Sequence, residues 1–187
     1  MNDILNIVEK TDASLQGMQT NRDIYPTDEA AVIMKDTYGR ITLSKIRWGY
    51  PGINGFGWLI NAKAESVLDK KMFEGGIRRH RAIIPASCFY EWSSRKEKNT
   101  FRRKDRGTVY MAGFYDLTDS GERFVILTTQ ANASIIKIHD RMPLILEKAQ
   151  IKDWLLDDTA VGNLLRQIPA LLNRETEYEQ QTLFDLT

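Results

Sequence analysis

The chain has 187 residues, of which 42% are hydrophobic and 27% are charged, and its formal net charge is +1. This composition is typical of a folded globular domain and argues against a disordered chain. No apolar run approaches the ~20 residues of a membrane-spanning helix, and the N-terminus lacks the basic segment of a signal peptide. Cys88 is the only cysteine, which excludes an internal disulfide and a thiolate metal cluster. We therefore expect a cytoplasmic protein that needs neither metal nor other cofactor and does not enter the membrane.

Hydrophobic periodicity and turn residues divide the chain into predicted elements. In the first half these are a helix at residues 4–8, strands at 30–34 and 41–48, irregular glycine-rich backbone at 49–57, and a short helix at 70–75 that ends at Gly75-Gly76. In the second half they are strands at 82–85, 88–92, 109–117, 124–129 and 142–146, a charged hairpin tip at 95–106, and helices at 131–138, 150–156 and 160–168. Strands and helices do not alternate regularly, so we predict an α+β fold rather than a doubly wound parallel sheet. The sequence contains no linker long enough to divide the chain, so we expect residues 1–187 to form one domain.

Basic side chains concentrate in two runs, at residues 78–81 and 95–106, whereas acidic side chains gather toward the C-terminus. Phosphate binding requires clustered cations rather than a high total charge. The alternative is that both runs are solvated loops, and the pattern alone favours that alternative.

Polar residues interrupt otherwise apolar segments at three places. Glu91 lies between Tyr90 and Trp92, where partial burial would raise its pKa and suit it to proton transfer, although it is equally well explained as an outward-facing strand residue. His139 can give and take a proton near neutral pH, but a lone histidine is more often structural. Asn61 can hold a carbonyl oxygen, and the alternative is an ordinary turn asparagine.

Taken together and in order, these segments resemble the SOS response-associated peptidase (SRAP) family. The matching motifs are Arg47-Trp48-Gly49, Asn61-Ala62-Lys63-Ala64-Glu65, Ile84-Pro85-Ala86 with Phe89-Tyr90-Glu91-Trp92, Leu127-Thr128-Thr129 with Ala131-Asn132, and His139-Asp140-Arg141-Met142-Pro143, with Tyr25-Pro26-Thr27 a looser match. The resemblance implies a compact α+β fold built on a central, curved, barrel-like mixed β-structure flanked by helices, with a cationic groove for single-stranded DNA.

The resemblance also implies a function in DNA repair. Members recognise abasic sites, and their N-terminal cysteine crosslinks to the sugar aldehyde through a thiazolidine ring, which protects the lesion. Carried over by motif, the catalytic residues are Asn61, Glu91 and His139, and the DNA contacts are Trp48, Lys63, Arg78, Arg79 and Arg141. A nucleoid-associated location in the cytoplasm would follow.

The chain departs from the family at its N-terminus, where Met1-Asn2-Asp3-Ile4 stands in place of Met-Cys-Gly-Arg. Thiazolidine formation needs an amine and a thiol on one residue, so this polypeptide is not expected to form the crosslink, and Cys88 offers no free amine. Three explanations are considered: a start assigned downstream of the native one, a natural paralogue that only binds DNA, and a resemblance in fold alone. Lys63, where the family usually has arginine, is a smaller departure.

The C-terminal residues suggest a partner. Gln180, Leu183 and Phe184 form a Gln-x-x-Leu-Phe pattern that resembles the peptide with which bacterial repair proteins bind the sliding clamp. A flexible tail at residues 174–187 would present them, whereas a C-terminal strand packed on its own domain is an equally good interpretation.

Three functions follow as hypotheses. The first is a DNA–protein crosslinker, the second a non-catalytic module that binds single-stranded DNA, and the third a peptidase that processes its own N-terminus.

Overall fold

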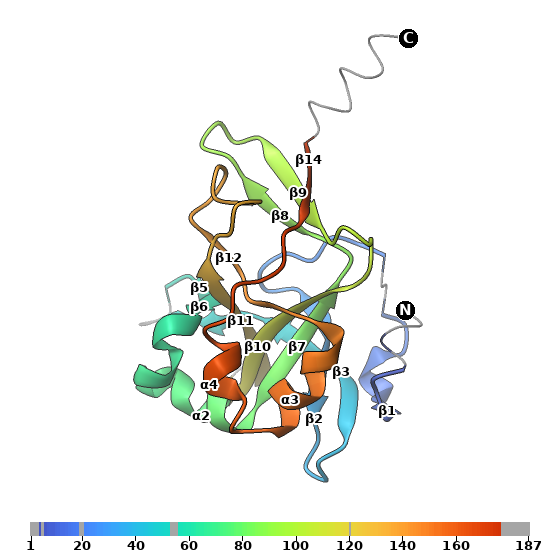
Figure 1. Cartoon of the computed structure of the whole chain (residues 1–187). Coiled ribbons are helices and arrows are strands. Elements are labelled where there is room, and N and C mark those ends of the chain that lie inside the picture. Colours follow the sequence, from blue (N-terminus) through green and yellow to red (C-terminus); the bar gives the residue numbers. More distant parts are fainter. Residues whose placement is uncertain (1–3, 5, 19–20, 53–55, 120, 177–187) are drawn as a thin grey trace.

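A closed sheet of five strands forms the centre of the molecule (Figure 1). The computed structural model describes residues 4, 6–18, 21–52, 56–119 and 121–176. Around the barrel the strands are β3 (Ile41–Trp48), β2 (Glu29–Lys35), β7 (Arg81–Ala86), β10 (Val109–Thr118) and β11 (Gly121–Gln130), and β11 pairs back onto β3. The β11–β3 pair is parallel and the other four are antiparallel. The predicted α+β class with a barrel-like mixed β-structure is confirmed.

Shorter strands extend this barrel at its ends. β1 (Lys10–Thr11) pairs with β3, β6 (Asn61–Lys63) and β12 (Arg141–Pro143) pair with β11, and β13 (Ile145–Leu146) pairs with β10. A second sheet has the order β14 (Asn173–Thr176), β9 (Lys98–Arg102), β8 (Phe89–Trp92), and β4 (Tyr50–Pro51) pairs with β5 (Trp58–Leu59). The second sheet stands at one end of the barrel, near β12 (Figure 1).

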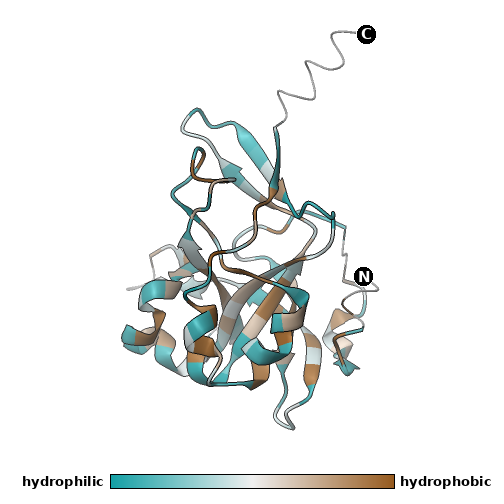
Figure 2. Ribbon diagram, viewed as in Figure 1, coloured by the Kyte–Doolittle hydropathy of each residue, from teal (hydrophilic) through white to brown (hydrophobic). Residues whose placement is uncertain are grey.

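The two faces of the barrel strands carry two separate apolar clusters, because successive side chains of a strand point to opposite faces. Helices α2 (Lys71–Arg79), α3 (Ile151–Leu156) and α4 (Val161–Leu164) pack on the outer face, where Phe73 and Trp154 meet Phe114 and Leu127. The other face contributes Phe124 and its neighbours to an inner cluster, which continues into Phe89 and Phe101 of the second sheet. Figure 2 shows that hydrophilic and hydrophobic residues alternate along these helices.

Helix α2 does not end where the sequence predicted. It continues through Gly75 and Gly76 to Arg79. A Cβ on Gly76 would lie 2.4 Å from Cδ2 of Phe114, so this glycine allows the helix to approach the barrel closely rather than ending it. The glycines were predicted to end the helix, whereas Gly76 instead allows α2 to pack against Phe114 of β10.

Three further segments differ from prediction. Within the predicted tip at 95–106, residues Lys98–Arg102 form β9 in the middle of the second sheet, and the turn covers Ser93–Glu97, where the Ser93 amide donates to the Glu97 carbonyl (3.0 Å). Residues 133–138 form consecutive hydrogen-bonded turns instead of a regular helix, and the predicted strand at 142–146 is divided into β12 and β13. For β9, β12 and β13, pairing with other strands rather than local composition sets the boundaries.

The two ends of the chain fall partly outside the described residues. At the predicted N-terminal helix the amides of Ile7 and Val8 donate to the Ile4 carbonyl, and residues 1–3 and 5 lie outside the description. Residues Asn173–Thr176 form β14 and so begin as a strand rather than as a tail, whereas Gln180, Leu183 and Phe184 lie outside the described residues. Among the helices described, none is long and apolar enough to cross a bilayer.

Candidate functional site

Three predicted site residues line up along β11. In the strand register Trp48 pairs with Phe124, Asn61 with Ile126, and Lys63 with Thr128. Paired residues present their side chains on the same face of a sheet, so these three follow one face of β11 at intervals of about 7 Å. Asn61 and Lys63 are exposed, whereas Ala62 between them is buried. Trp48 belongs to β3, and Asn61 and Lys63 belong to β6. Because all three pair with β11, we call them the β11 row.

Trp48 is fixed on this face by contacts on several sides. Its Nε1 donates to the Ile60 carbonyl (2.9 Å), and its ring stacks on Phe124 with centroids 6.2 Å apart. The Thr27 amide donates to the Trp48 carbonyl (2.9 Å). Thr27 has a φ of 77°, which is strained for a β-branched residue, and such strain is concentrated at functional sites. The loop that precedes β2 is therefore held against the β11 row.

Glu91 and His139 lie close together although 48 positions separate them in the sequence. Glu91 is half-buried on β8, and this burial raises the pKa of its carboxyl group, while the nearby charge of His139 acts to lower the pKa. A carboxyl group with a raised pKa beside an imidazole is the arrangement expected of an acid–base pair. The pair is therefore chemically suited to proton transfer.

The ring of His139 is oriented by the backbone of Arg141. The Arg141 amide donates to Nδ1 of His139 (2.9 Å), and the Arg141 carbonyl lies 3.1 Å from the same nitrogen. Nδ1 can therefore accept a hydrogen bond when unprotonated and donate one when protonated. Nε2 has no hydrogen-bond partner among the residues that the structure describes, so it is available to a ligand.

The side chain of Arg141 ties β12 to the segment after β6. Its guanidinium binds both carboxylate oxygens of Glu65 (2.8 and 2.9 Å) and donates to the Thr128 carbonyl (2.6 Å). Strand β6 ends at Lys63, the partner of Thr128, so the guanidinium binds this carbonyl just where the parallel ladder stops. The same ion pair lowers the pKa of Glu65. Arg141, predicted as a phosphate contact, is thus already paired with a carboxylate in the free protein.

The structure does not bring Arg78 and Arg79 to this site. Both lie at the end of α2, where Arg78 pairs with Glu74 (3.1 Å) and Arg79 lines a cavity together with Glu122. Glu122 and Thr128 are six positions apart on β11, which corresponds to about 20 Å along the strand. Arg78 and Arg79, predicted as DNA contacts, are thus separated from Lys63 in the free protein, because the chain direction carries the end of α2 away from the end of β11 with which Lys63 pairs.

Cys88 does not complete the site either. Its thiol interacts with the Tyr90 hydroxyl, which also donates to Asp23 (2.8 Å). Tyr90 and Glu91 are adjacent in a strand and so point to opposite faces. In the part of the chain that the structure describes, no group of three or more His, Cys, Asp or Glu side chains could hold a metal ion.

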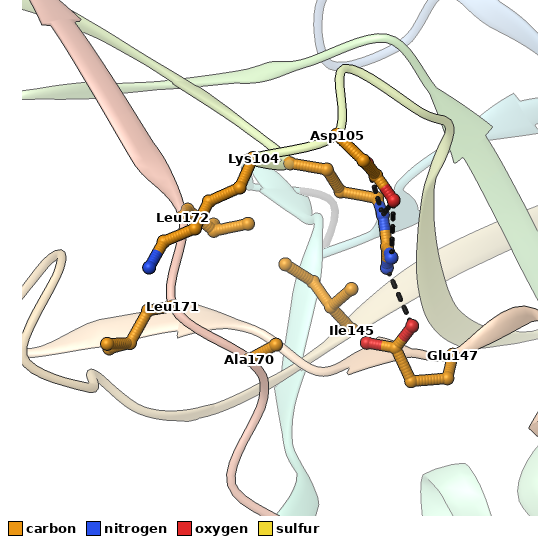
Figure 3. A pocket seen from close by; sticks show the side chains of 8 residues that line it. Lys104, Asp105, Ile145, Glu147, Ala170, Leu171 and Leu172 are labelled. Carbon is orange, nitrogen blue, oxygen red and sulfur yellow. Dashed lines mark hydrogen bonds and ion pairs between the residues drawn. The ribbon is translucent and has the colours of Figure 1, made fainter.

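A cavity of about 180 Å³ lies elsewhere, between the loop that follows β9 and residues 170–172 (Figure 3). Its wall combines Ile145, Ala170 and Leu172 with the Arg103 guanidinium, which is held by Asp105 and Glu147. None of the predicted site residues lines it, so it is separate from the Glu91–His139 pair.

Comparisons with known proteins identify the family of the chain. The model of the family described as SOS response associated peptidase (SRAP) matches residues 2–180. The chain belongs to the SRAP family. Its relatives include the abasic site processing protein YoaM of Bacillus subtilis, 31% identical over 73% of this chain and 66% of the relative, and YedK of Escherichia coli, 29% identical over 66% and 60%. The matched region thus spans less than two thirds of each relative.

Solved structures share the SRAP fold of this chain. A Bordetella bronchiseptica protein superposes with a TM-score of 0.77, 21% identity and coverage of 94% of both chains. A Bacteroides thetaiotaomicron protein gives a TM-score of 0.66 at 24% identity, covering 80% of this chain and 74% of its own.

Three residues around these side chains were given no role of their own from the sequence. Thr27 is strained beside Trp48, Glu65 holds Arg141, and Asn99 lies opposite Glu91 in the second sheet. Glu65 was part of a matched motif, but nothing local indicates its partner 76 positions away. Asn99 was hidden in a charged segment that was interpreted as a hairpin tip.

Replacing Glu91 with glutamine should raise thermal stability at pH 7–8 by on the order of 1–3 °C. Burial raises the pKa of Glu91 in the folded state, so keeping this group ionised above that pKa disfavours folding. Below about pH 4 the group is protonated in both states and the difference should vanish. Thermal unfolding from pH 4 to pH 8 measures this, with the exposed Glu74→Gln as the matched control. A gain in stability that is constant with pH would contradict the prediction.

Proposed function

We propose that this chain binds single-stranded DNA at abasic sites, with the exposed sugar beside Glu91 and His139. The observation that carries the proposal is the electrostatic interaction between these two side chains, which come from β8 and from the turn before β12. Lys63 of the β11 row pairs with Thr128, whose carbonyl binds Arg141 of β12. The names of the relatives, abasic site processing proteins, support the same assignment.

The chemistry of an abasic sugar fits these side chains. The sugar interconverts between a closed ring and an open aldehyde, and each interconversion moves a proton to or from the ring oxygen. Burial raises the pKa of Glu91, which favours the protonated carboxyl group that can supply this proton, and the imidazole of His139 can accept or return it. Asn61 offers an amide to a sugar oxygen, Lys63 a charge to a phosphate, and Trp48 a ring face to a base.

We propose recognition of the lesion by these side chains as an activity separate from thiazolidine formation. The thiazolidine needs a cysteine with a free α-amine, and Cys88, inside the chain beside Tyr90, has none. Crosslinking is the proposed activity of a form that carries an N-terminal cysteine. Autopeptidase activity is the second candidate, since the same acid–base pair suits hydrolysis. Clamp binding by Gln180, Leu183 and Phe184 stays a prediction.

Fluorescence anisotropy with a labelled single-stranded oligonucleotide tests the proposal. We expect an oligonucleotide with one central abasic site to bind several-fold more tightly than the intact sequence, because an unstacked site is less costly to present to a pocket. Lys63→Met should weaken binding by about 3–10-fold and reduce the slope of log Kd against log salt by about one.

Arg78→Met is the matched control, since it removes an equal charge at the other end of the barrel, and it should change the affinity less than about twofold. Equal affinity for abasic and intact DNA, or equal losses in the Lys63 and Arg78 variants, would contradict the proposal.

A further inference from the structure

Asn99 occupies the centre of the second sheet. It pairs with Glu91 of β8 on one side and with Thr176 of β14 on the other. Its side chain is fully buried, with 0% relative exposure. Asparagine is rarely buried to this extent unless its polar atoms find partners.

The orientation of the Asn99 amide is fixed by one of its hydrogen bonds. Nδ2 donates to the Glu97 carbonyl (2.9 Å), and because a carbonyl can only accept, the two ends of the amide cannot be exchanged. Oδ1 is thereby committed to the other direction, where it is buried without a hydrogen-bond donor. A buried acceptor without a donor destabilises a fold, so we expect a hydrogen-bond donor close to this oxygen.

Glu91 is placed to supply that partner. Directly opposed residues of antiparallel strands present their side chains on one face, with Cβ atoms about 4.5–5.5 Å apart. Glu91 and Asn99 share the face of Phe89 and Phe101, whose rings stack with centroids 5.4 Å apart. An ionised carboxylate has no proton to donate, whereas a protonated carboxyl group has one.

Other charged groups around Glu91 do not offer the same contact. His139, in the turn before β12, acts through its charge to lower the pKa of Glu91. Arg174 of β14 shares the face but lies two strands away at the register of Phe101, and Lys98 and Glu175 point to the opposite face. Asn99 is the polar residue that strand pairing places directly opposite Glu91.

We propose that Asn99 is a positioning residue for Glu91, whose protonated carboxyl group donates a hydrogen bond to Oδ1 of Asn99. The contact favours the neutral carboxyl group and fixes the oxygen that holds the proton. Its importance for DNA rests on the proposed function, in which Glu91 delivers this proton to the abasic sugar.

Carboxyl-carbon NMR titration of Glu91 in the DNA-free protein tests the inference. In Asn99→Ala the midpoint should fall toward the ordinary range of glutamate, because the neutral form has lost its acceptor. Thr100→Ala, on the same strand but the opposite face, should leave the midpoint where it is in the wild type. An unchanged midpoint in Asn99→Ala would overturn the inference.

A second measurement does not depend on how well the Asn99 variant folds. In Glu91→Gln the new amide resembles the protonated acid and should donate to Oδ1 of Asn99, so its hydrogens should exchange at least about tenfold more slowly than those of a free glutamine. Exchange at the free rate would overturn the inference. Both measurements omit DNA, so failure of abasic-site binding with a shifted midpoint would reject the proposed function and leave the Asn99–Glu91 contact standing.

Discussion

Replacing Arg81 with methionine should lower the free energy of unfolding by about 3 kcal/mol. Arg81 begins β7 and is only 5% exposed. Its guanidinium donates to the carbonyls of Ile77 (3.3 Å) and Arg78 (3.0 Å) at the end of α2, and to the carbonyl of Trp154 in α3. Methionine retains much of the apolar volume but leaves these carbonyls without their charged donor, and carbonyls at helix ends have no partner within the helix.

Chemical denaturation at neutral pH measures the effect, and Asp158→Asn is the matched control. Asp158 accepts from the same guanidinium, but its side chain is 81% exposed, so the loss of its charge should cost less than about 1 kcal/mol. Equal losses in the two variants would mean that the ion pair, rather than the contacts with the helix ends, stabilises this junction.

Replacing Arg141 with methionine should destabilise the protein by about 2 kcal/mol and weaken the binding of abasic DNA. The substitution removes the paired hydrogen bonds to Glu65 and leaves the Thr128 carbonyl unpaired. The bond from the Arg141 amide to Nδ1 of His139 belongs to the backbone and should persist. The experiment therefore separates the role of the side chain from that of the backbone which orients the imidazole.

Denaturation and anisotropy on one preparation give both results for this variant. Arg78→Met again serves as the control, because its exposed ion pair with Glu74 joins residues one helical turn apart and should contribute less than about 0.5 kcal/mol. An Arg141 variant as stable as the Arg78 variant would show that Thr128 and Glu65 find other partners.

The sequence predicted the local elements whose patterns are strong. Residues 41–48 were predicted as a strand and form β3 with the same limits, and the strand predicted at 30–34 lies within β2. Branched apolar side chains favour a pleated strand; they form a continuous apolar run at 30–34 and are interspersed with polar residues at 41–48. The motifs also sufficed to predict the family, since five of them in register are specific although each is short.

The composition of the site depended on which distant segments became neighbours. Lys63 and Arg78 were equally good candidates for a phosphate contact, and only the register of β6 on β11 and the direction of α2 separated them. In the sequence, Glu91 and His139 were each weak candidates for a catalytic role. The fold brings β8 and the turn before β12 together, so that the two residues interact. Strand pairing likewise places Glu91, the proposed hydrogen-bond donor to Oδ1, opposite Asn99.

By itself, the sequence determined the alternation of the strands, the family and the chemical groups available to the site. The tertiary structure decided which of these groups meet, how deeply Glu91 is buried and whether a cation such as Arg141 is already paired. The physical reason is that strand propensity and side-chain chemistry belong to single residues, whereas pKa values and ion pairs depend on neighbours that are brought close only when the barrel closes.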